Sequence, residues 1–318
     1  MGTGRFSRLA ASAGLWLWLA PVLHVTSFWL MLQDAEPFHT SFYSLAWWSY
    51  ILFISALNHR WRGNSLLFDQ WREFTWVFLV STPAWLFFEL CNFRLHNWHY
   101  IGVPSEWWVR LPGYFIAFGT VLPGVFETRV LLQNLGLRFR RGRTRPITSR
   151  GSPGLRGLIG AVMLAAALLW PHLFFPLVWA GPVLLLEWLV ALSGEEGLSA
   201  SLARGDYSLA IQLLVSGLVC GFLWEFWNFW AGAKWVYSIP YLNSFQVFEM
   251  PLAGFLGFPP FALCCYLIYR LSIAPRAWIT ARRSRVILMS ALYVLCCWTV
   301  FLGIERVTVL EYKPFWPL

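Results

Sequence analysis

The sequence predicts an all-α integral membrane protein with about nine transmembrane helices, and three observations lead to this class. Of its 318 residues, 58% are hydrophobic and only 12% are charged, which is about half the charged fraction of a typical soluble domain. Apolar runs of about 20 residues, the length that crosses a bilayer as a helix, recur along the chain. The arginines that give the chain its net charge of +9 gather in a few segments between these runs, which is typical of cytoplasmic loops in membrane proteins.

The apolar runs divide the chain into nine predicted spans. The first is interpreted as a retained helix and not as a signal peptide, because no convincing small-residue cleavage site follows it. The fifth and sixth are separated only by a short segment in which Pro171 and Pro176 favour a turn. The nine runs cover residues 11–32, 41–57, 72–92, 110–134, 156–173, 174–192, 208–231, 248–270 and 285–304.

The arginine-rich segments orient the predicted helices. Residues 138–156 contain seven arginines and no acid, and residues 276–285 contain four arginines. Placing both segments in the cytoplasm puts the N-terminus inside and the C-terminus outside, and we expect the protein to reside in a bacterial inner membrane. The same basic loops are expected to contact anionic lipid head groups, and nucleic-acid binding is not expected.

An internal repeat relates two parts of the chain. The segment at 81–104 aligns with the segment at 217–240, and the next stretch, 110–132, aligns with 249–269. The coincidence of rare residues predicts a duplicated unit of three helices, spans two to four and six to eight, with both halves running in the same direction. The matched pairs are Glu89 with Glu225, Asn92 with Asn228, Trp98 with Trp235, Tyr100 with Tyr237, and Pro104 with Pro240.

The repeat also sets the predicted organisation of the chain. An N-terminal span comes first, two repeats flank a basic loop and a linking span, and a last span leads into the C-terminal tail. The corresponding ranges are 1–40 for the first span, 41–137 for repeat 1, 138–155 for the basic cytoplasmic loop, 156–173 for the linking span, 174–271 for repeat 2 and 272–318 for the end.

Buried acids are the strongest functional signal in the sequence. Glu89 and Glu225 each lie three residues before an asparagine, so each acid shares a helix face with its amide. An acid within a membrane span is costly and points to a functional site, whereas Asn92 and Asn228 are equally well explained as hydrogen-bonding links between packed helices. We predict that both glutamates line a cavity shared by the two repeats, and that Asn92 and Asn228 contribute to binding there.

Two further intramembrane acids complete the candidate set. Glu127 follows Pro123 in the fourth predicted span, and its counterpart in the second repeat is Cys264. It is predicted to act with Glu89 and Glu225 as a catalytic residue. Glu187 has no matching acid in the first repeat and is predicted to contribute to binding.

Two aromatic pairs follow the helices that carry the acids. An aromatic belt at the membrane surface explains each of these residues singly, but it does not explain their repeated spacing from the glutamates. We therefore predict that they bind the ligand. The pairs are Trp98 with Tyr100 and Trp235 with Tyr237.

The sequence contains no pattern for a metal or a cofactor. Its six cysteines form no C-x-x-C pair, so neither a zinc site nor a disulfide framework is indicated. A phosphate-binding glycine loop is also missing. We therefore expect no metal and no cofactor.

The repeated pattern resembles the membrane-integral lycopene cyclases of the two-subunit and fused types. The shared pattern is a polar residue at the end of one helix, a W-x-Y loop, and a proline followed by an acid in the next helix. The resemblance implies cyclisation of a linear carotenoid by protonation and deprotonation without redox change. This chain departs from the family pattern at two places. Asn92 and Asn228 replace aspartate at the helix ends, and the lone Glu127 stands where the family has a pair of acids. The residues that carry over are Glu127, Trp98, Tyr100, Trp235 and Tyr237.

Two hypotheses follow for the function. The first is a protein of lycopene-cyclase-like fold that binds a long apolar lipid or isoprenoid, or acts on it by acid–base chemistry. The second is a transporter built from parallel repeats, or a membrane scaffold without catalysis. An enzyme for a membrane-dissolved substrate is expected to open sideways to lipid, and a transporter is expected to open to both faces.

Overall fold

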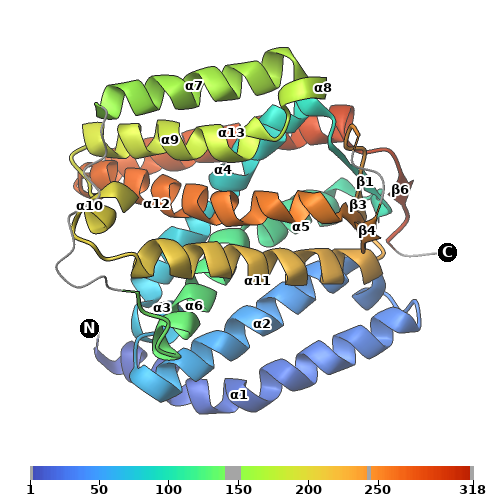
Figure 1. Cartoon of the computed structure of the whole chain (residues 1–318). Coiled ribbons are helices and arrows are strands. Elements are labelled where there is room, and N and C mark those ends of the chain that lie inside the picture. The colour runs from blue at the N-terminus through green and yellow to red at the C-terminus, as the bar shows by residue number, and fades with distance from the viewer. Residues whose placement is uncertain (1–2, 140–151, 242–244, 316–318) are drawn as a thin grey trace.

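The computed structural model describes residues 3–139, 152–241 and 245–315, and this part of the chain is built almost entirely of helices (Figure 1). The long helices are α1 (Thr3–Leu32), α2 (Phe38–Arg62), α4 (Trp71–Leu95), α5 (Trp107–Phe118), α6 (Val121–Asn134), α7 (Pro153–Leu169), α9 (Leu177–Leu192), α11 (Ser208–Trp230), α12 (Phe258–Thr280) and α13 (Arg283–Val307). The short helices are α3 (Leu66–Asp69), α8 (Pro171–Phe174), α10 (Leu198–Ala203) and the 3₁₀ helix η1 (Leu252–Gly257). The strands are β1 (Trp98–Ile101), β2 (Val103–Pro104), β3 (Lys234–Tyr237), β4 (Gln246–Val247), β5 (Met250–Pro251) and β6 (Tyr312–Lys313).

The predicted all-α membrane class is confirmed. Within the described residues, six segments are helical, long and apolar enough to cross a bilayer. The protein is therefore an integral membrane protein. The six segments are Ser12–Leu32, Trp71–Leu95, Trp107–Asn134, Ser208–Trp230, Leu252–Thr280 and Arg283–Val307.

The other three predicted spans fall on α2, α7 and α9. Helix α2 is long enough, but its serines, tyrosines and tryptophans make it less apolar than the six. Helices α7 and α9 have 17 and 16 residues, which is shorter than the roughly 20 that a spanning helix needs. The count of nine therefore stays a prediction.

The fourth predicted span consists of two helices, α5 and α6. Ser81 of α4 occupies the break between them, because its hydroxyl donates to the Phe118 carbonyl at 2.6 Å and accepts from the Leu122 amide at 3.0 Å. At the end of α5, Gly119 packs so closely against the Phe78 ring that an added Cβ would clash with it. Pro123 lies in the first turn of α6, where a missing amide costs no helical hydrogen bond.

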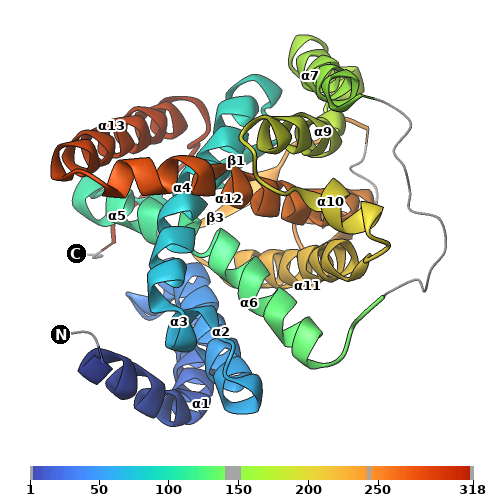
Figure 2. The same ribbon diagram turned by 90° about the vertical axis from the view of Figure 1, so that its left-hand side faces the viewer.

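The helices run side by side, with α1 and α2 at one edge and α7 and α9 at the other (Figures 1 and 2). Helices α4, α6, α11 and α12 form the middle of the bundle. At the α7–α9 edge, glycines allow the backbones to touch, since a Cβ on Gly160 would lie 2.6 Å from the Gly181 carbonyl oxygen. Small residues in such positions are a common way to pack helices in lipid.

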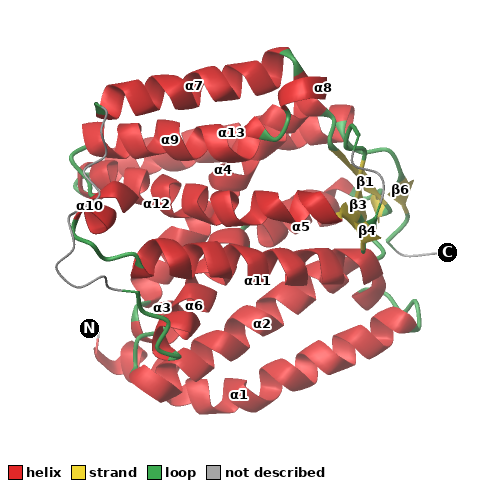
Figure 3. Cartoon of the chain, viewed as in Figure 1, coloured by secondary structure: helices red, strands yellow, loops and turns green. Residues whose placement is uncertain are grey.

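The strands gather at one end of the bundle (Figure 3). Strands β1 and β3 pair in antiparallel fashion and form what we call the ribbon, residues 98–101 with 234–237. The C-terminal segment closes over it, because the Tyr100 amide donates to the Thr308 carbonyl and the Leu310 amide donates to the Tyr100 carbonyl, both at 2.8 Å. The ribbon thus joins the loop after α4 to the loop after α11. Its register pairs Trp98 with Tyr237, His99 with Val236, Tyr100 with Trp235 and Ile101 with Lys234.

Candidate functional site

Glu89 is fully buried in α4 and is held by aromatic donors alone. Its Oε1 atom accepts hydrogen bonds from the indole of Trp85 at 2.8 Å, the indole of Trp98 at 3.1 Å and the hydroxyl of Tyr100 at 2.5 Å. Its Oε2 atom is buried and has no hydrogen-bond partner among the described residues. A buried oxygen without a partner costs about 1–3 kcal/mol, so the site keeps one half of this carboxyl group free at a cost in stability.

Glu225 in α11 has a similar but simpler arrangement. Its Oε1 atom accepts from the Tyr237 hydroxyl at 2.6 Å, and that hydroxyl in turn accepts from the Trp235 indole at 2.8 Å. Its Oε2 atom is likewise buried without a partner in the described part of the chain. The position of Trp85 is occupied here by Gly221, whose neighbour Phe258 leaves no room for a side chain. The two acids are therefore alike in burial and different in the number of their donors.

The asparagines hold the loops that lead into the ribbon. The Asn92 amide donates to the Trp98 carbonyl at 2.8 Å, and its oxygen accepts from the Asn97 amide at 2.8 Å. Asn228 does the same with Trp235, donating to its carbonyl at 2.8 Å and accepting from its amide at 2.9 Å. These contacts position the aromatic residues that contact the acids, and they do not link one helix to another.

The ribbon brings the donors of the two acids together. Its register places Tyr100 opposite Trp235. The hydroxyl pKa of Tyr100 is raised well above its usual value, first by burial and then by the nearby Glu89 carboxyl. Burial and the Glu225 carboxyl raise the pKa of Tyr237 in the same way. Both phenols therefore keep their protons at physiological pH and remain hydrogen-bond donors.

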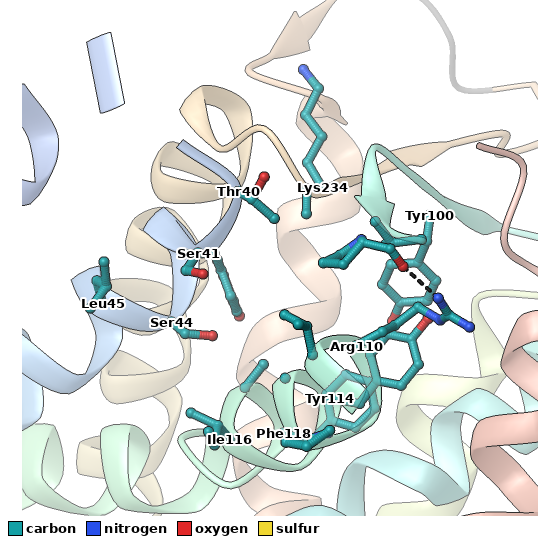
Figure 4. A pocket seen from close by; sticks show the side chains of 18 of the residues that line it. Thr40, Ser41, Ser44, Leu45, Tyr100, Arg110, Tyr114, Ile116, Phe118 and Lys234 are labelled. Carbon is teal, nitrogen blue, oxygen red and sulfur yellow. Dashed lines mark hydrogen bonds between the residues drawn. The ribbon is translucent and has the colours of Figure 1, made fainter. Parts of the chain in front are cut away.

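A cavity of about 420 Å³ lies between α2, α5 and the ribbon (Figure 4). Trp85, Tyr100 and Trp235 are part of its wall, so each buried acid is separated from the cavity by side chains that also belong to its hydrogen-bond network. A volume of this size is within the range of small-molecule sites. A second, much smaller hollow shares Trp85, Trp224 and Trp235 with the first and adds Trp98 and Tyr237.

The cavity reaches the outer surface of the bundle. Trp108 and Ile116 of α5 line it and are 61% and 43% exposed. Both belong to a segment that is apolar enough to cross the membrane, so their exposed sides face lipid. From this we infer a sideways opening of the cavity between α2 and α5.

Glu127 contacts a different part of the protein. Its Oε1 atom accepts from the Ser65 hydroxyl at 2.9 Å and the Leu67 amide at 3.1 Å, and its Oε2 atom accepts from the Asn58 amide at 2.8 Å. The three donors come from the end of α2, the loop before α3 and the first turn of α3. None of the three acids is part of the wall of either cavity, but Glu127 shares no hydrogen-bond partner with Glu89 or Glu225 and has none in the ribbon.

Glu187 holds a loop as well. Its carboxyl oxygens accept from the Leu198 amide at 3.0 Å and the Ser199 amide at 2.8 Å, at the start of α10. Gly197 lies against the carboxyl so closely that a Cβ would clash. These contacts explain a partly buried acid at this position without a ligand, because amide groups in the first turn of a helix lack helical partners.

Sequence reasoning missed several residues of the site. Trp85 lies four residues before Glu89, on the same helix face, and this spacing was a usable signal. The residues of α2 and α5 that form the cavity gave no such signal, because their role depends on how the two helices pack. They include Ser41, Ser44, Leu45, Trp48, Arg110, Gly113 and Tyr114.

The described residues contain no cluster of three or more histidine, cysteine or acidic side chains that could hold a metal ion. Most of the basic loop predicted to contact anionic lipid, residues 138–155, lies outside the described residues. No family model, curated protein or solved structure matches this chain. The function therefore has to be inferred from the geometry of the site.

Proposed function

We propose that the protein binds a long apolar lipid or isoprenoid in the aromatic cavity, and that Glu89 and Glu225 supply and remove protons without redox change from behind the cavity wall, with Tyr100 and Trp235 of that wall between them and the ligand. The observation that carries this proposal is the burial and the incomplete hydrogen bonding of the two carboxyl groups. Each is buried, each has one oxygen held by aromatic donors of the ribbon, and each has one oxygen free of partners among the described residues.

The chemistry of a buried carboxyl group fits this role. An ionised carboxylate is costly among apolar side chains unless it is fully paired, so the neutral acid is the less costly form here. A neutral acid shielded from water donates a proton to a weak base such as a carbon–carbon double bond, and aromatic faces stabilise the resulting cation. Loss of a proton from a neighbouring carbon to the carboxylate that the first step leaves behind restores both a double bond and the neutral acid. The proton count is balanced and no oxidant or reductant is needed.

The surroundings of the acids support an apolar ligand. Rings of Trp85 and Trp224 lie 5.1 Å apart between their centroids, and those of Trp224 and Trp235 lie 6.1 Å apart. These rings belong to the cavity wall, and the sideways opening admits a molecule dissolved in the bilayer.

The proposal also covers the number of membrane spans, their orientation and the internal repeat. We infer nine spans with the N-terminus in the cytoplasm, and two parallel three-helix repeats related to the lycopene cyclases. Support comes from the ribbon, because α4 and α11 both end there and the loops that follow them pair with each other. If the halves ran in opposite directions, these loops would lie on opposite sides of the membrane.

Mass spectrometry of lipids that co-purify with the protein tests the binding step. The protein and the variants Glu89→Gln and Glu225→Gln would be purified from a bacterial host, with Glu196→Gln as the control. Glu196 forms a well-exposed ion pair with Arg204, so this control changes the charge without touching the site. We expect one class of apolar molecule to be enriched with the unaltered protein. Folded protein without any enriched lipid would contradict the proposal.

A second experiment tests the reaction. If lycopene is the substrate, a host that accumulates lycopene should contain cyclised pigment when it produces the unaltered protein. It should contain unchanged lycopene when it produces the Glu89→Gln variant. Unchanged lycopene with both proteins would exclude lycopene as the substrate. The co-purified lipid would then be added back to the protein, and its conversion by the unaltered protein alone is the expected result.

A further inference from the structure

Arg129 is a cation within a membrane-spanning segment, and no acid of this chain neutralises it. It lies in the second half of α6, at the end of the bundle opposite the ribbon (Figure 1). None of the ion pairs among the described residues includes it. Residues 1–11, 140–151, 242–244 and 316–318, whose side chains the structure does not describe, contain no aspartate or glutamate. A charge of this kind inside a span typically marks a functional site.

One edge of the Arg129 guanidinium group is open to a partner from outside the chain. Its Nη1 atom donates to the side-chain oxygen of Gln133 at 3.3 Å, which is a long hydrogen bond. Its Nε and Nη2 atoms have no partner among the described residues, yet they are not among the sealed polar atoms, which include the Nε atoms of Arg156 and Arg270. Arg129 as a whole is partly exposed, so a ligand can reach Nε and Nη2.

Glu127, the acid nearest in sequence, faces away from Arg129. Two residues along a helix turn a side chain to nearly the opposite face, and the Glu127 carboxyl group is held by donors of α2 and α3. Arg129 instead shares a face with Phe126, three residues earlier. That face packs on α12, where the Phe126 and Tyr269 rings lie 5.4 Å apart.

The acids of α4, α9 and the α9–α10 loop, which lie around α12 at this end, are also bound. Each forms an ion pair with another arginine or accepts from backbone amides, so the charge of Arg129 remains for a partner from outside the chain. The contacts are Glu73 with Arg276, Glu195 with Arg270, Glu196 with Arg204, and Glu187 with the amides of Leu198 and Ser199.

Tyr266 of α12 supplies a second donor near Arg129. The two groups lie within electrostatic range of each other. The Tyr266 hydroxyl has no hydrogen-bond partner in the described part of the chain, and it is not one of the sealed atoms either. Tyr269, one turn further along the same helix, differs in this respect, because its hydroxyl donates to Glu73 at 2.7 Å.

We propose that Arg129 and Tyr266 bind a phosphate group. A guanidinium edge with two N–H donors matches two phosphate oxygens, and Nε with Nη2 is the edge that Arg129 leaves open. The phosphate belongs either to a phospholipid head group or to a free phosphate at this end of the bundle. The site is distinct from the contacts expected of the arginine-rich loops, because Arg129 lies within a helix of the bundle. It does not depend on the function proposed for the aromatic cavity.

The preference for an anionic lipid tests the site. Full-length protein in detergent micelles would be offered equal amounts of phosphatidylglycerol and phosphatidylcholine, and bound lipid would be counted by native mass spectrometry. Arg129→Gln should weaken phosphatidylglycerol binding by about tenfold or more, the usual effect of losing hydrogen bonds to a charged group. Arg283→Gln is the control, because it removes an exposed arginine at the start of α13 and should leave this binding unchanged. Equal losses in the two variants would indicate general charge attraction and overturn the proposal.

Inorganic phosphate distinguishes the two sources of the ligand. The melting temperature would be measured in phosphatidylcholine nanodiscs with phosphate and with chloride at equal ionic strength. A rise with phosphate that the Arg129→Gln variant lacks identifies free phosphate as the ligand. Phosphatidylglycerol binding that depends on Arg129, without such a rise, identifies the lipid. Neither effect in folded protein would overturn the proposal.

Two neighbouring tyrosines provide a matched pair of variants. Tyr266→Phe removes a hydroxyl that the described chain leaves unbonded, so it should weaken binding of the phosphate ligand by about fivefold at an unchanged melting temperature. Tyr269→Phe removes the donor to Glu73, so it should lower the melting temperature and leave binding unchanged. The reverse pattern, or full binding in both variants, would overturn the assignment of Tyr266 to the site.

Discussion

Tyr100 lies opposite Trp235 across the β1–β3 ribbon, and the two side chains belong to the hydrogen-bond networks of different buried acids. Tyr100 donates to Glu89, whereas Trp235 donates to the hydroxyl that reaches Glu225. The ribbon is thus the structural link between the two halves of the site. Changes on one strand of it are expected to affect both acids.

Removing the two tyrosine hydroxyls should have unequal effects on stability. Tyr100→Phe breaks one hydrogen bond and leaves Glu89 with two indole donors. Tyr237→Phe breaks two, the bond to Glu225 and the bond from Trp235. With about 1 kcal/mol for each bond, we expect Tyr237→Phe to lower the free energy of unfolding by about 1 kcal/mol more than Tyr100→Phe. Chemical unfolding in detergent micelles measures both, and equal losses would contradict the assigned contacts.

Stability should fall in strongly alkaline solution. The pKa values of Tyr100 and Tyr237 are raised well above that of an unfolded tyrosine, because burial and a neighbouring carboxyl disfavour the phenolate. The folded state therefore holds these protons more tightly than the unfolded state, and the free energy of unfolding drops as the pH rises past about 10. Between pH 8 and 11, the free energy of unfolding should fall less steeply for the double variant Tyr100→Phe, Tyr237→Phe than for the unaltered protein. An unchanged slope would assign the effect to other groups.

Asn92→Asp should destabilise the protein, although aspartate is the residue that the resembled family carries there. The Asn92 amide donates to the Trp98 carbonyl at 2.8 Å, and a carboxylate would place an acceptor against that carbonyl. We expect a loss of about 1–3 kcal/mol in unfolding free energy. Asn64→Asp is a milder control, since Asn64 exchanges hydrogen bonds with the partly buried Asn134 amide. A variant as stable as the unaltered protein would show that this loop accepts either residue.

Glu127→Gln tests the role that the resemblance gives to this residue. The carboxyl accepts from a hydroxyl and a backbone amide on one oxygen and from an amide on the other, and a glutamine offers one acceptor in place of two. We expect a thermal shift downward, consistent with a loss of about 1–3 kcal/mol, and an unchanged set of bound lipids. Lost activity at full stability would instead support a catalytic Glu127. Cys264→Ala, at the matching position of the second repeat, serves as the comparison.

The sequence identified the residues of the site through their repeated spacing, but it predicted that the aromatic pairs bind a ligand and not that they donate hydrogen bonds to the acids. Glu89 and Tyr100 recur as Glu225 and Tyr237, and a helix followed by a short loop leaves each tyrosine close to its acid. The integral membrane class was equally accessible, since composition and run length determine it.

Other features depend on contacts between distant segments. The break after Gly119 is invisible in an apolar run, because it is bridged by Ser81 from another helix. The environment of Glu127 depends on the path of the α2–α3 loop. The cavity itself exists only because α2 and α5 pack beside the ribbon, and no local spacing within either helix indicates it.

The sideways opening beside Trp108 and Ile116 has a consequence for how affinity is defined. A molecule that enters from the bilayer is diluted by lipid and not by water, so occupancy depends on its mole fraction in the membrane. Two ligands with equal contacts in the cavity would then differ in apparent affinity from water by the whole difference in their partitioning. Dissociation constants for this protein are accordingly comparable only when they are expressed per mole of lipid.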